Sequence, residues 1–335
     1  NLDYMKHFLA LIVIAYFCSS LAYAQTYKNT NDQQNGKTFG QLMTWVLDGE
    51  KGPKRVAIET SNEWQSLSTD QTNYAVWIGH ATYLINNGDI NILTDPIFSK
   101  RASPFGFAGH KRMIPPVMTL NDLPRIDVVV VSHNHYDHLD IWSLKKLYKL
   151  NPETVFLVPV GDGKRLTRSG IKNVYEMKWW DIFSHSDTSF HFTPVQHWSK
   201  RGLFDRNKSL WGGWFIKTEA LALYHAGDTG YSSDFKTTYQ RLGAPDYSFI
   251  PIGAYDPRWF MKDSHVNPEE AVQIALDLKT SQSFGMHWGT FTLTDEPVLE
   301  PPKRLEQELK KLNLKSDFFR SPKPGEILQL TKEAL

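Results

Sequence analysis

Within residues 132–140, SHNHYDHLD, the six residues 133–138 contain four side chains of the kinds that bind transition metals. His133 and His135 alternate, so an extended backbone projects both imidazoles to the same side. Asp137 and His138 follow where the chain turns toward a helix, and they can face a second point nearby. Imidazole and carboxylate suit Zn²⁺, and also iron or manganese. The segment therefore predicts a metal-binding loop and not merely a structural histidine cluster.

Three further candidate ligands, His197, Asp228 and His287, each follow a short apolar run. Such a run is typical of a strand, and side chains at the ends of strands converge on one edge of a sheet, where a site is rigid and open. Any one of the three, taken alone, has an equally good structural explanation. Together with the 133–138 cluster they predict two metal sites.

The single cysteine, Cys18, lies in a segment with the features of an export signal. Residues 5–24 have a basic start, an apolar run, and small residues at Ala22 and Ala24. The apolar run is shorter than the roughly 20 residues that span a bilayer, although an uncleaved anchor is the alternative. Cleavage before Gln25 would remove the only thiol, so metal ligands must be His and carboxylates. We expect an exported protein, periplasmic or secreted.

Short apolar runs alternate with turn residues from position 74 onward. Strands are expected at 74–78, 83–85, 90–93, 126–131, 154–158, 190–193, 214–217, 220–225, 247–252 and 284–286. Helices are expected at 141–150, 235–242, 268–279 and 303–312, the third beginning with Pro268 after an Asn267 cap. Many strands with interspersed helices predict a layered α/β sandwich that holds the candidate ligands at strand ends.

The chain divides into a signal peptide at 1–24, an N-terminal extension at 25–72 and one main domain at 73–335. Apolar residues at helical spacing in 39–47 predict a short amphipathic helix in the extension, which packs on the main domain or lies at a lipid interface. Lys plus Arg is 37 and Asp plus Glu is 36, for a net charge of +1. This balance argues against a nucleic-acid partner, and any membrane-surface association would rest on apolar contacts.

The pattern His-x-His-x-Asp-His followed by a later His, Asp and His resembles the metallo-β-lactamase superfamily. Longer strings resemble one branch of it, N-acylphosphatidylethanolamine-hydrolysing phospholipase D. These strings are WIGHAT at 77–82, LTDPIF at 93–98, AGDTGY at 226–231, PRWFM at 257–261 and HWGTF at 287–291. The resemblance extends over roughly residues 39–320. It implies a metallo-β-lactamase-like αββα four-layer sandwich over the main domain.

The resemblance also implies two Zn²⁺ ions per chain. The implied ligands are His133, His135 and His197 for the first ion, Asp137, His138 and His287 for the second, and Asp228 between them. Asp95 matches a position that supports a ligating histidine. Asp137 and Asp228 are also implied as catalytic residues, and His265 is implied to bind the substrate phosphate or to protonate the leaving group. His80 matches a motif near the metals, with a hydrogen-bonded core histidine as the alternative.

By this resemblance the chain is a phosphodiesterase of phospholipase D type. It would cleave N-acylphosphatidylethanolamine-like lipids to phosphatidic acid and N-acylethanolamine by a metal-bridged hydroxide. The alternative is a lactonase, esterase or amidase with a small non-lipid substrate; a non-catalytic binding protein is disfavoured because every implied ligand is present. Candidate apolar lining residues are Phe105, Phe107, Trp259, Phe260 and Met261. The oligomeric state is open, and a homodimer is allowed.

Overall fold

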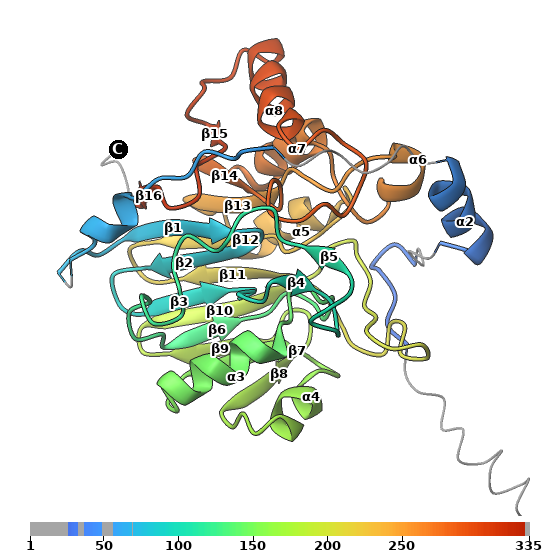
Figure 1. Ribbon diagram of the computed structural model, residues 1–335. Helices are drawn as coiled ribbons and strands as arrows, with labels where there is room; N and C mark the ends of the chain where they lie inside the picture. The colour runs from blue at the N-terminus through green and yellow to red at the C-terminus, as the bar shows by residue number, and fades with distance from the viewer. Residues whose placement is uncertain (1–25, 33–36, 49–55, 69, 332–335) are drawn as a thin grey trace, which may run out of the picture.

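Two seven-stranded sheets stack face to face in the computed structural model, which describes residues 26–32, 37–48, 56–68 and 70–331 (Figure 1). The first sheet has the strand order β16-β1-β2-β3-β6-β7-β8. Its strands are β1 (Tyr74–Gly79), β2 (Thr82–Asn86), β3 (Asn91–Thr94), β6 (Val128–Val130), β7 (Val155–Pro159), β8 (Val174–Met177) and β16 (Ile327–Gln329).

The second sheet has the order β15-β14-β13-β12-β11-β10-β9. Its strands are β9 (Ile182–His185), β10 (Thr188–Thr193), β11 (Gly213–Lys217), β12 (Ala222–His225), β13 (Tyr247–Pro251), β14 (Gln282–Met286) and β15 (Phe319–Arg320). A small separate ribbon pairs β4 (Arg101–Ala102) with β5 (His110–Lys111). Both large sheets are mixed: the pairs from β16 to β3 are antiparallel and those from β3 to β8 parallel, while the pairs from β15 to β12 are parallel and those from β12 to β9 antiparallel.

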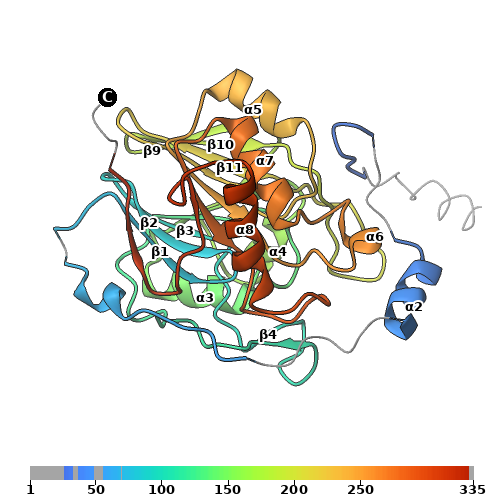
Figure 2. The ribbon, with the colours of Figure 1, turned by 90° about the horizontal axis from the view of Figure 1, so that it is seen from above.

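Helices cover the outer face of each sheet (Figures 1 and 2). On the first sheet lie α3 (Ile141–Leu150) and α4 (Gly163–Arg168), and on the second lie α5 (Asp234–Leu242), α7 (Pro268–Leu278) and α8 (Glu300–Lys311). The short helices η1 (Glu63–Ser66), α2 (Phe39–Asp48) and α6 (Arg258–Met261) lie outside these layers. This is the αββα four-layer sandwich, which confirms the predicted fold class.

Aromatic side chains fill the space between the sheets. Trp77 and Tyr83 from the first sheet and Trp214 and Phe249 from the second are all fully buried. The rings of Tyr83 and Phe249 lie 4.5 Å apart, centroid to centroid. Removing this much apolar surface from water is the main stabilisation of such a core. The strand ends that carry the metal-type residues are therefore held by a rigid interior.

Helix caps fix the chain where it leaves the site. Asp140 caps α3, its Oδ1 accepting from the backbone N of Trp142 at 3.2 Å. Asn267 caps α7, as predicted, and the side chain of Glu270 completes a capping box. Because α3 begins directly after the 132–140 loop, its cap also fixes the end of that loop.

Most expected elements exist, with shifted bounds. β6 (Val128–Val130) is shorter than the expected 126–131 strand. The structure adds the strands β4, β5, β8, β9, β15 and β16, which the sequence did not predict. It also adds α4 and α6, which are only 6 and 4 residues long and too short for apolar periodicity to reveal. The expected signal peptide lies outside the described residues, and the division at 24 and 72 stays a prediction. Within the described part of the chain, no helix is both long and apolar enough to cross a bilayer.

Candidate metal centre

All seven side chains that the sequence singled out as ligands meet at one edge of the sandwich. The loop after β6 supplies His133, His135, Asp137 and His138 from the first sheet. Segments that follow β10, β12 and β14 supply His197, Asp228 and His287 from the second sheet. Five of the seven residues are buried, and His135 and Asp137 are partly exposed. The site therefore spans the gap between the sheets, and neither sheet forms it alone.

Three histidines form the first group. Nε2 of His133 lies 2.9 Å from Nδ1 of His135, and that same Nδ1 lies 3.3 Å from Nε2 of His197. Their ligand-type atoms all lie within 4.8 Å of one another. Four tetrahedral ligands at the usual zinc–nitrogen bond length lie about 3.3 Å apart. The group has the separation that a zinc site needs.

The second group combines one carboxylate with two histidines. Nε2 of His138 lies 3.2 Å from Nε2 of His287. Oδ2 of Asp137 lies 3.5 Å from each of these two nitrogens. His80 adds a third nitrogen, with Nε2 at 2.9 Å from Asp137 Oδ2. His80 is fully buried, and its contact makes it a residue that holds Asp137 in place.

Asp228 lies between the two groups. Its Oδ2 is 3.0 Å from Nε2 of His138, 3.2 Å from Nε2 of His287 and 3.8 Å from Nε2 of His133. One carboxylate oxygen therefore faces both clusters of nitrogens, as a bridging ligand must.

Residues behind the ligands fix which ring nitrogen faces the centre. Asp95 Oδ2 lies 2.9 Å from Nδ1 of His138 and accepts from Oγ of Ser132 at 2.7 Å. Ser132 Oγ in turn lies 2.9 Å from Nδ1 of His133. Because a carboxylate only accepts hydrogen bonds, Nδ1 of His138 carries the proton and its Nε2 faces the centre. Asp95 is the supporting residue that the resemblance implied.

The electrostatics of the site favour a cation. Burial opposes ionisation of Asp228 and Asp137, but the neighbouring His138 outweighs it and holds the pKa of both carboxyls well below the usual range. Against the same burial, these carboxylates raise the pKa of His138 and bring that of His287 to about 9. Burial lowers the pKa of His135 to about 4, so this imidazole is neutral and available as a ligand.

Several buried polar atoms of the centre have no protein partner among the described residues. They include Oδ1 of Asp228 and Nδ1 of His265. An unsatisfied buried polar atom is costly, and a bound cation with its water would satisfy these. The donor types, their separations and these free atoms all fit a pair of metal ions.

The backbone of the site is held in uncommon conformations. His80, Asp95 and His287 have φ angles of 57°, 36° and 71°, in the left-handed region that non-glycine residues rarely occupy. Each such residue costs of order 1 kcal/mol, and such residues cluster at functional sites because the surrounding fold enforces them. Here the left-handed turns place two imidazoles and the supporting carboxylate directly at strand ends.

A cavity of about 530 Å³ opens onto the centre. Its floor includes the ligand-type residues His135, Asp137 and Asp228. One wall is apolar and comes from α2, α6 and the loop after β14; it contains Leu42, Trp45, Phe260, Met261 and Leu293. Another wall carries Trp198, Lys200 and Arg206, with the Arg206 guanidinium 4.7 Å from the Trp198 ring. This cavity has the size of a small-molecule site.

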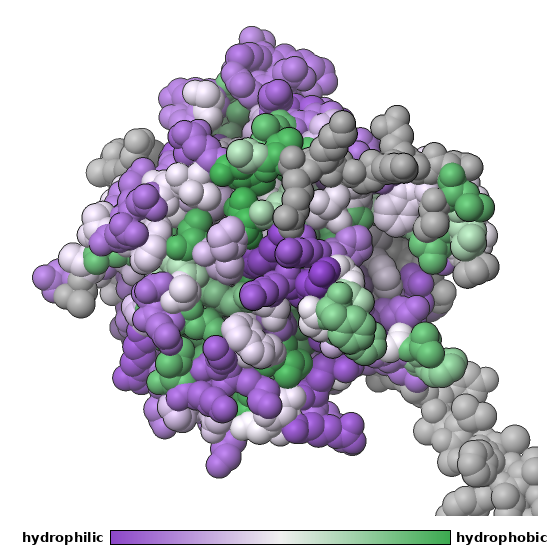
Figure 3. Space-filling view, viewed as in Figure 1, coloured by the Kyte–Doolittle hydropathy of each residue, from purple (hydrophilic) through white to green (hydrophobic). Residues whose placement is uncertain are grey.

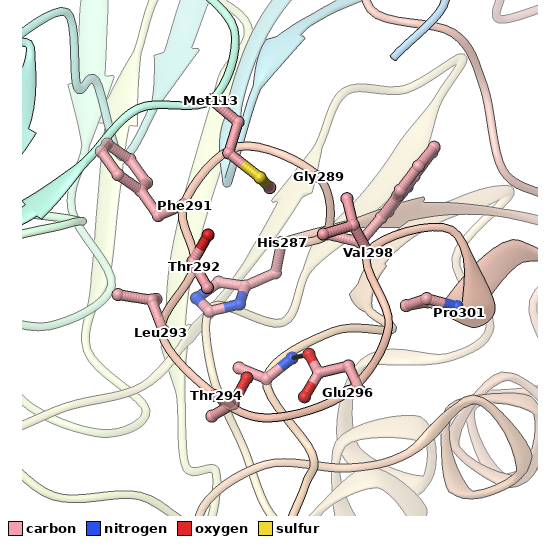
Figure 4. A pocket seen from close by; sticks show the side chains of 12 residues that line it. Met113, His287, Gly289, Phe291, Thr292, Leu293, Thr294, Glu296, Val298 and Pro301 are labelled. Carbon is pink, nitrogen blue, oxygen red and sulfur yellow. Dashed lines mark hydrogen bonds between the residues drawn. The ribbon is translucent and has the colours of Figure 1, made fainter. Parts of the chain in front are cut away.

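His287 lines a second, much smaller cavity (Figure 4). The loop after β14 curves around it, and Met113, Phe291 and Glu296 contribute to its lining. Its volume is about 20 Å³, enough for about one water molecule. Of these two cavities, only the larger one has room for a molecule bigger than water beside the ligand-type residues.

The predicted substrate-side residues divide into two sets. His265 lines the large cavity, with Nδ1 4.0 Å from Oδ2 of Asp228, and Phe260 and Met261 line it as expected. Phe105, Phe107 and Trp259 do not line it; they are 55%, 83% and 47% exposed. The expectation for these three was wrong because an aromatic residue type does not tell on which side of its loop or helix the ring lies.

Sequence reasoning missed three supporting groups. Ser132, which links Asp95 to His133, is adjacent to a ligand and could have been found from that position. The carbonyl of Ser264 accepts from Nδ1 of His197 at 2.9 Å, and Asn29 accepts from the backbone N of His197 at 3.0 Å. No local pattern reveals these two, since they lie 67 and 168 residues from His197.

Comparison with known proteins agrees with this geometry. A family model described as "Beta-lactamase superfamily domain" matches residues 90–288. "N-acyl-phosphatidylethanolamine-hydrolyzing phospholipase D 1" of Caenorhabditis elegans is 41% identical over 266 residues, covering 76% of this chain and 75% of that protein. The mitochondrial protein of the same description from Saccharomyces cerevisiae is 38% identical, over 70% of this chain and 51% of its own.

A solved structure, isothiocyanate hydrolase from Delia radicum gut bacteria, shares the fold. Its TM-score is 0.62 at 18% identity, covering 76% of this chain and 98% of that chain. The chain thus belongs to the metallo-β-lactamase superfamily and is a metal-dependent hydrolase. Within that superfamily it belongs to the family of N-acylphosphatidylethanolamine-hydrolysing phospholipase D.

Proposed function

We propose that this chain is a dizinc phosphodiesterase that hydrolyses N-acylphosphatidylethanolamine-like lipids to phosphatidic acid and N-acylethanolamine. Two zinc ions would supply activated water and neutralise phosphate charge. The first would be held by His133, His135 and His197, the second by Asp137, His138 and His287, and Asp228 would lie between them. One phosphorus–oxygen bond breaks, the new oxygen stays on phosphatidic acid, and the alcohol leaves with a proton. The two relatives described above, at 41% and 38% identity, support this substrate class.

The observation that carries the proposal is that the large cavity has both an apolar wall and positively charged side chains. Its apolar wall includes Leu42, Trp45 and Phe260, while Lys200 and Arg206 lie on another wall beside the ligand-type residues. A lipid phosphodiester has the same division, with acyl chains attached to an anionic group. A small lactone or ester would leave much of such a wall without contact.

His265 is the residue we assign to the substrate phosphate. It lies on the cavity wall next to Asp228, and its Nδ1 has no hydrogen-bond partner among the described residues. A ring nitrogen in this position can donate to a phosphate oxygen or to the departing alcohol oxygen. Asp137, held by His80 at 2.9 Å, orients the attacking water from the floor of the cavity.

We also propose that the protein docks on a membrane surface. Four strongly exposed apolar side chains, Phe107, Leu203, Phe204 and Leu47, are 83%, 83%, 85% and 73% exposed. Each lies on a segment that also supplies cavity-lining residues: the turn before His110, the loop between Lys200 and Arg206, and α2. Figure 3 displays the apolar surface of α2 at the right of the view. Apolar tips around a cavity with an apolar wall suit insertion among lipid headgroups.

Export of the protein, by cleavage before Gln25, is part of the same proposal. It is tested by fractionating cells that make the full chain and sequencing the N-terminus of the exported product. A product that retains residues 1–24 would support the anchor instead.

The decisive experiment measures hydrolysis by zinc-loaded protein with phosphorus detection. The substrates are N-acylphosphatidylethanolamine, phosphatidylethanolamine without the N-acyl group, and a panel of lactones and carboxylic esters. We expect phosphatidic acid from the first substrate, and loss of the activity in Asp228→Asn protein that remains folded. Preferential turnover of the lactone panel would replace the proposal with the small-molecule hydrolase.

A further inference from the structure

The N-terminal segment 26–32 packs against the strand end that carries His197. Asn29 is 4% exposed, and its Oδ1 accepts two hydrogen bonds, from the backbone N of His197 at 3.0 Å and from Nε1 of Trp211 at 3.0 Å. The backbone N of Tyr27 donates to the carbonyl of Asn207 at 2.7 Å. A segment before the main domain thus reaches the back of the metal centre.

The same segment supports the side chain of His197 by a second route. Nδ2 of Asn31 donates to Oε1 of Gln196 at 2.9 Å, and Nε2 of Gln196 donates to the carbonyl of Asp263 at 3.0 Å. The next carbonyl, that of Ser264, lies 2.9 Å from Nδ1 of His197 and accepts from it. Asn29 thus holds the backbone of His197, while the contacts through Asn31, Gln196 and Ser264 support its ring.

The backbone amide of His197 needs this partner. It lies beyond the end of β10 (Thr188–Thr193), where the ladder to β11 has stopped, and His197 is fully buried. A buried amide without an acceptor is costly, so loss of the Asn29 oxygen would favour rotation of this peptide. Any rotation there moves Nε2 of His197 away from Nδ1 of His135, 3.3 Å away.

We propose that Asn29 is a positioning residue for the metal ligand His197. Its side-chain oxygen fixes the His197 peptide, and the fixed peptide aims the ring at the first group of ligands. The N-terminal extension is then part of the metal centre, although every implied ligand lies in the main domain. This inference rests on the metal centre of the proposed function and not on the lipid substrate.

The test compares three variants of the full-length, zinc-loaded chain. Asn29→Leu removes the acceptor, while Asn29→Asp keeps an oxygen at the same place. Thr30→Val is the matched control, because Oγ1 of Thr30 donates to Oδ1 of Asp234 at 2.7 Å and does not contact His197. Zinc affinity is measured by competition with a chromophoric chelator, and the melting temperature of each metal-free variant is recorded.

We expect Asn29→Leu to release one of its two zinc ions at a chelator concentration about 10- to 100-fold lower than wild type, the range for lost ligand-supporting hydrogen bonds. The second zinc ion should be retained, and Asn29→Asp should hold both ions within a few-fold of wild type. Thr30→Val should lower the melting temperature of the metal-free chain without changing the zinc affinity.

Two results would overturn this inference and leave the dizinc proposal standing. One is an equal zinc affinity in wild type and Asn29→Leu. The other is a loss of zinc affinity in Thr30→Val as large as in Asn29→Leu, which would indicate a general loosening of the segment. A loss of zinc affinity in Asn29→Asp as large as in Asn29→Leu would show that the side-chain oxygen does not position His197. A wild-type chain that binds no zinc would overturn the dizinc proposal together with this inference. The failures are therefore distinguishable from one another.

Discussion

Asp95 and His138 share a hydrogen bond in the fully buried interior, with Nδ1 of His138 2.9 Å from Oδ2 of Asp95. The same oxygen accepts from Oγ of Ser132, which contacts Nδ1 of His133. One carboxylate therefore orients one histidine of each ligand group. Such supporting contacts set the tautomer of a ligand and its basicity.

Replacing Asp95 should weaken metal binding while every ligand remains. In Asp95→Asn the amide can donate where the carboxylate only accepted, which favours the tautomer of His138 that carries its proton on Nε2. We expect about 10- to 100-fold weaker zinc binding, measured by chelator competition. Asp127→Asn is the control, since Asp127 accepts from the backbone of Asn91 away from the centre. Unchanged zinc affinity in Asp95→Asn would contradict the supporting role.

Replacing His265 should affect catalysis and not metal content. Positioned proton donors contribute about 100-fold or more to rate, so His265→Gln should lower kcat by at least that factor with two zinc ions retained. The readouts are phosphatidic acid release and zinc content by mass spectrometry. His191→Gln, a half-buried histidine on β10 outside the cavity, is the control and should keep the wild-type rate. Loss of zinc in His265→Gln would instead identify His265 as a ligand.

Polar substitutions at the exposed aromatic tips should weaken membrane binding. Burying a phenylalanine ring in an apolar environment contributes roughly 1.5–3 kcal/mol, so Phe107→Ser and Phe204→Ser should each reduce vesicle partitioning about tenfold or more. Sedimentation with phosphatidylcholine–phosphatidylethanolamine vesicles measures the effect. Ile182→Ser is the control, because Ile182 is 61% exposed on β9, which contributes nothing to the cavity. Equal partitioning of all variants would contradict docking through these tips.

Asp162 is buried and lies outside the metal centre, and its titration should make the free energy of unfolding depend on pH. Burial raises the pKa of its carboxyl from 3.8 to about 6, although Asn134 and Ser209 donate hydrogen bonds to it. The folded chain binds this proton more tightly than the unfolded chain, so the stabilisation is complete below pH 3.8 and is lost as the pH rises to about 6.

The variant Asp162→Asn removes that dependence and keeps the accepting oxygen. Its free energy of unfolding relative to wild type should increase between pH 4 and 6 by up to about 3 kcal/mol, and then stay constant. Urea unfolding of metal-free protein across this range measures the difference. A difference that stays flat from pH 4 to 6 would show that Asp162 is ionised throughout in the folded state.

The local features of the site were predictable because they depend on a few neighbouring residues. The alternation of His133 and His135 after a β-branched run placed both in a strand-to-helix loop. The Asn267-Pro268 pair marked the start of α7 correctly. The short helix α6 (Arg258–Met261) escaped prediction because four residues complete barely one turn and show no periodicity.

By itself, the sequence determined the types of the ligands, the alternation of strands and helices, and the class of chemistry, since residue type and periodicity are local properties. Only the tertiary structure decided that Asn29 supports His197 and that Phe107 points to solvent while Phe260 lines the cavity. Such contacts depend on how two sheets and their connecting loops pack together. No local pattern records the direction of a side chain relative to a segment more than a hundred residues away.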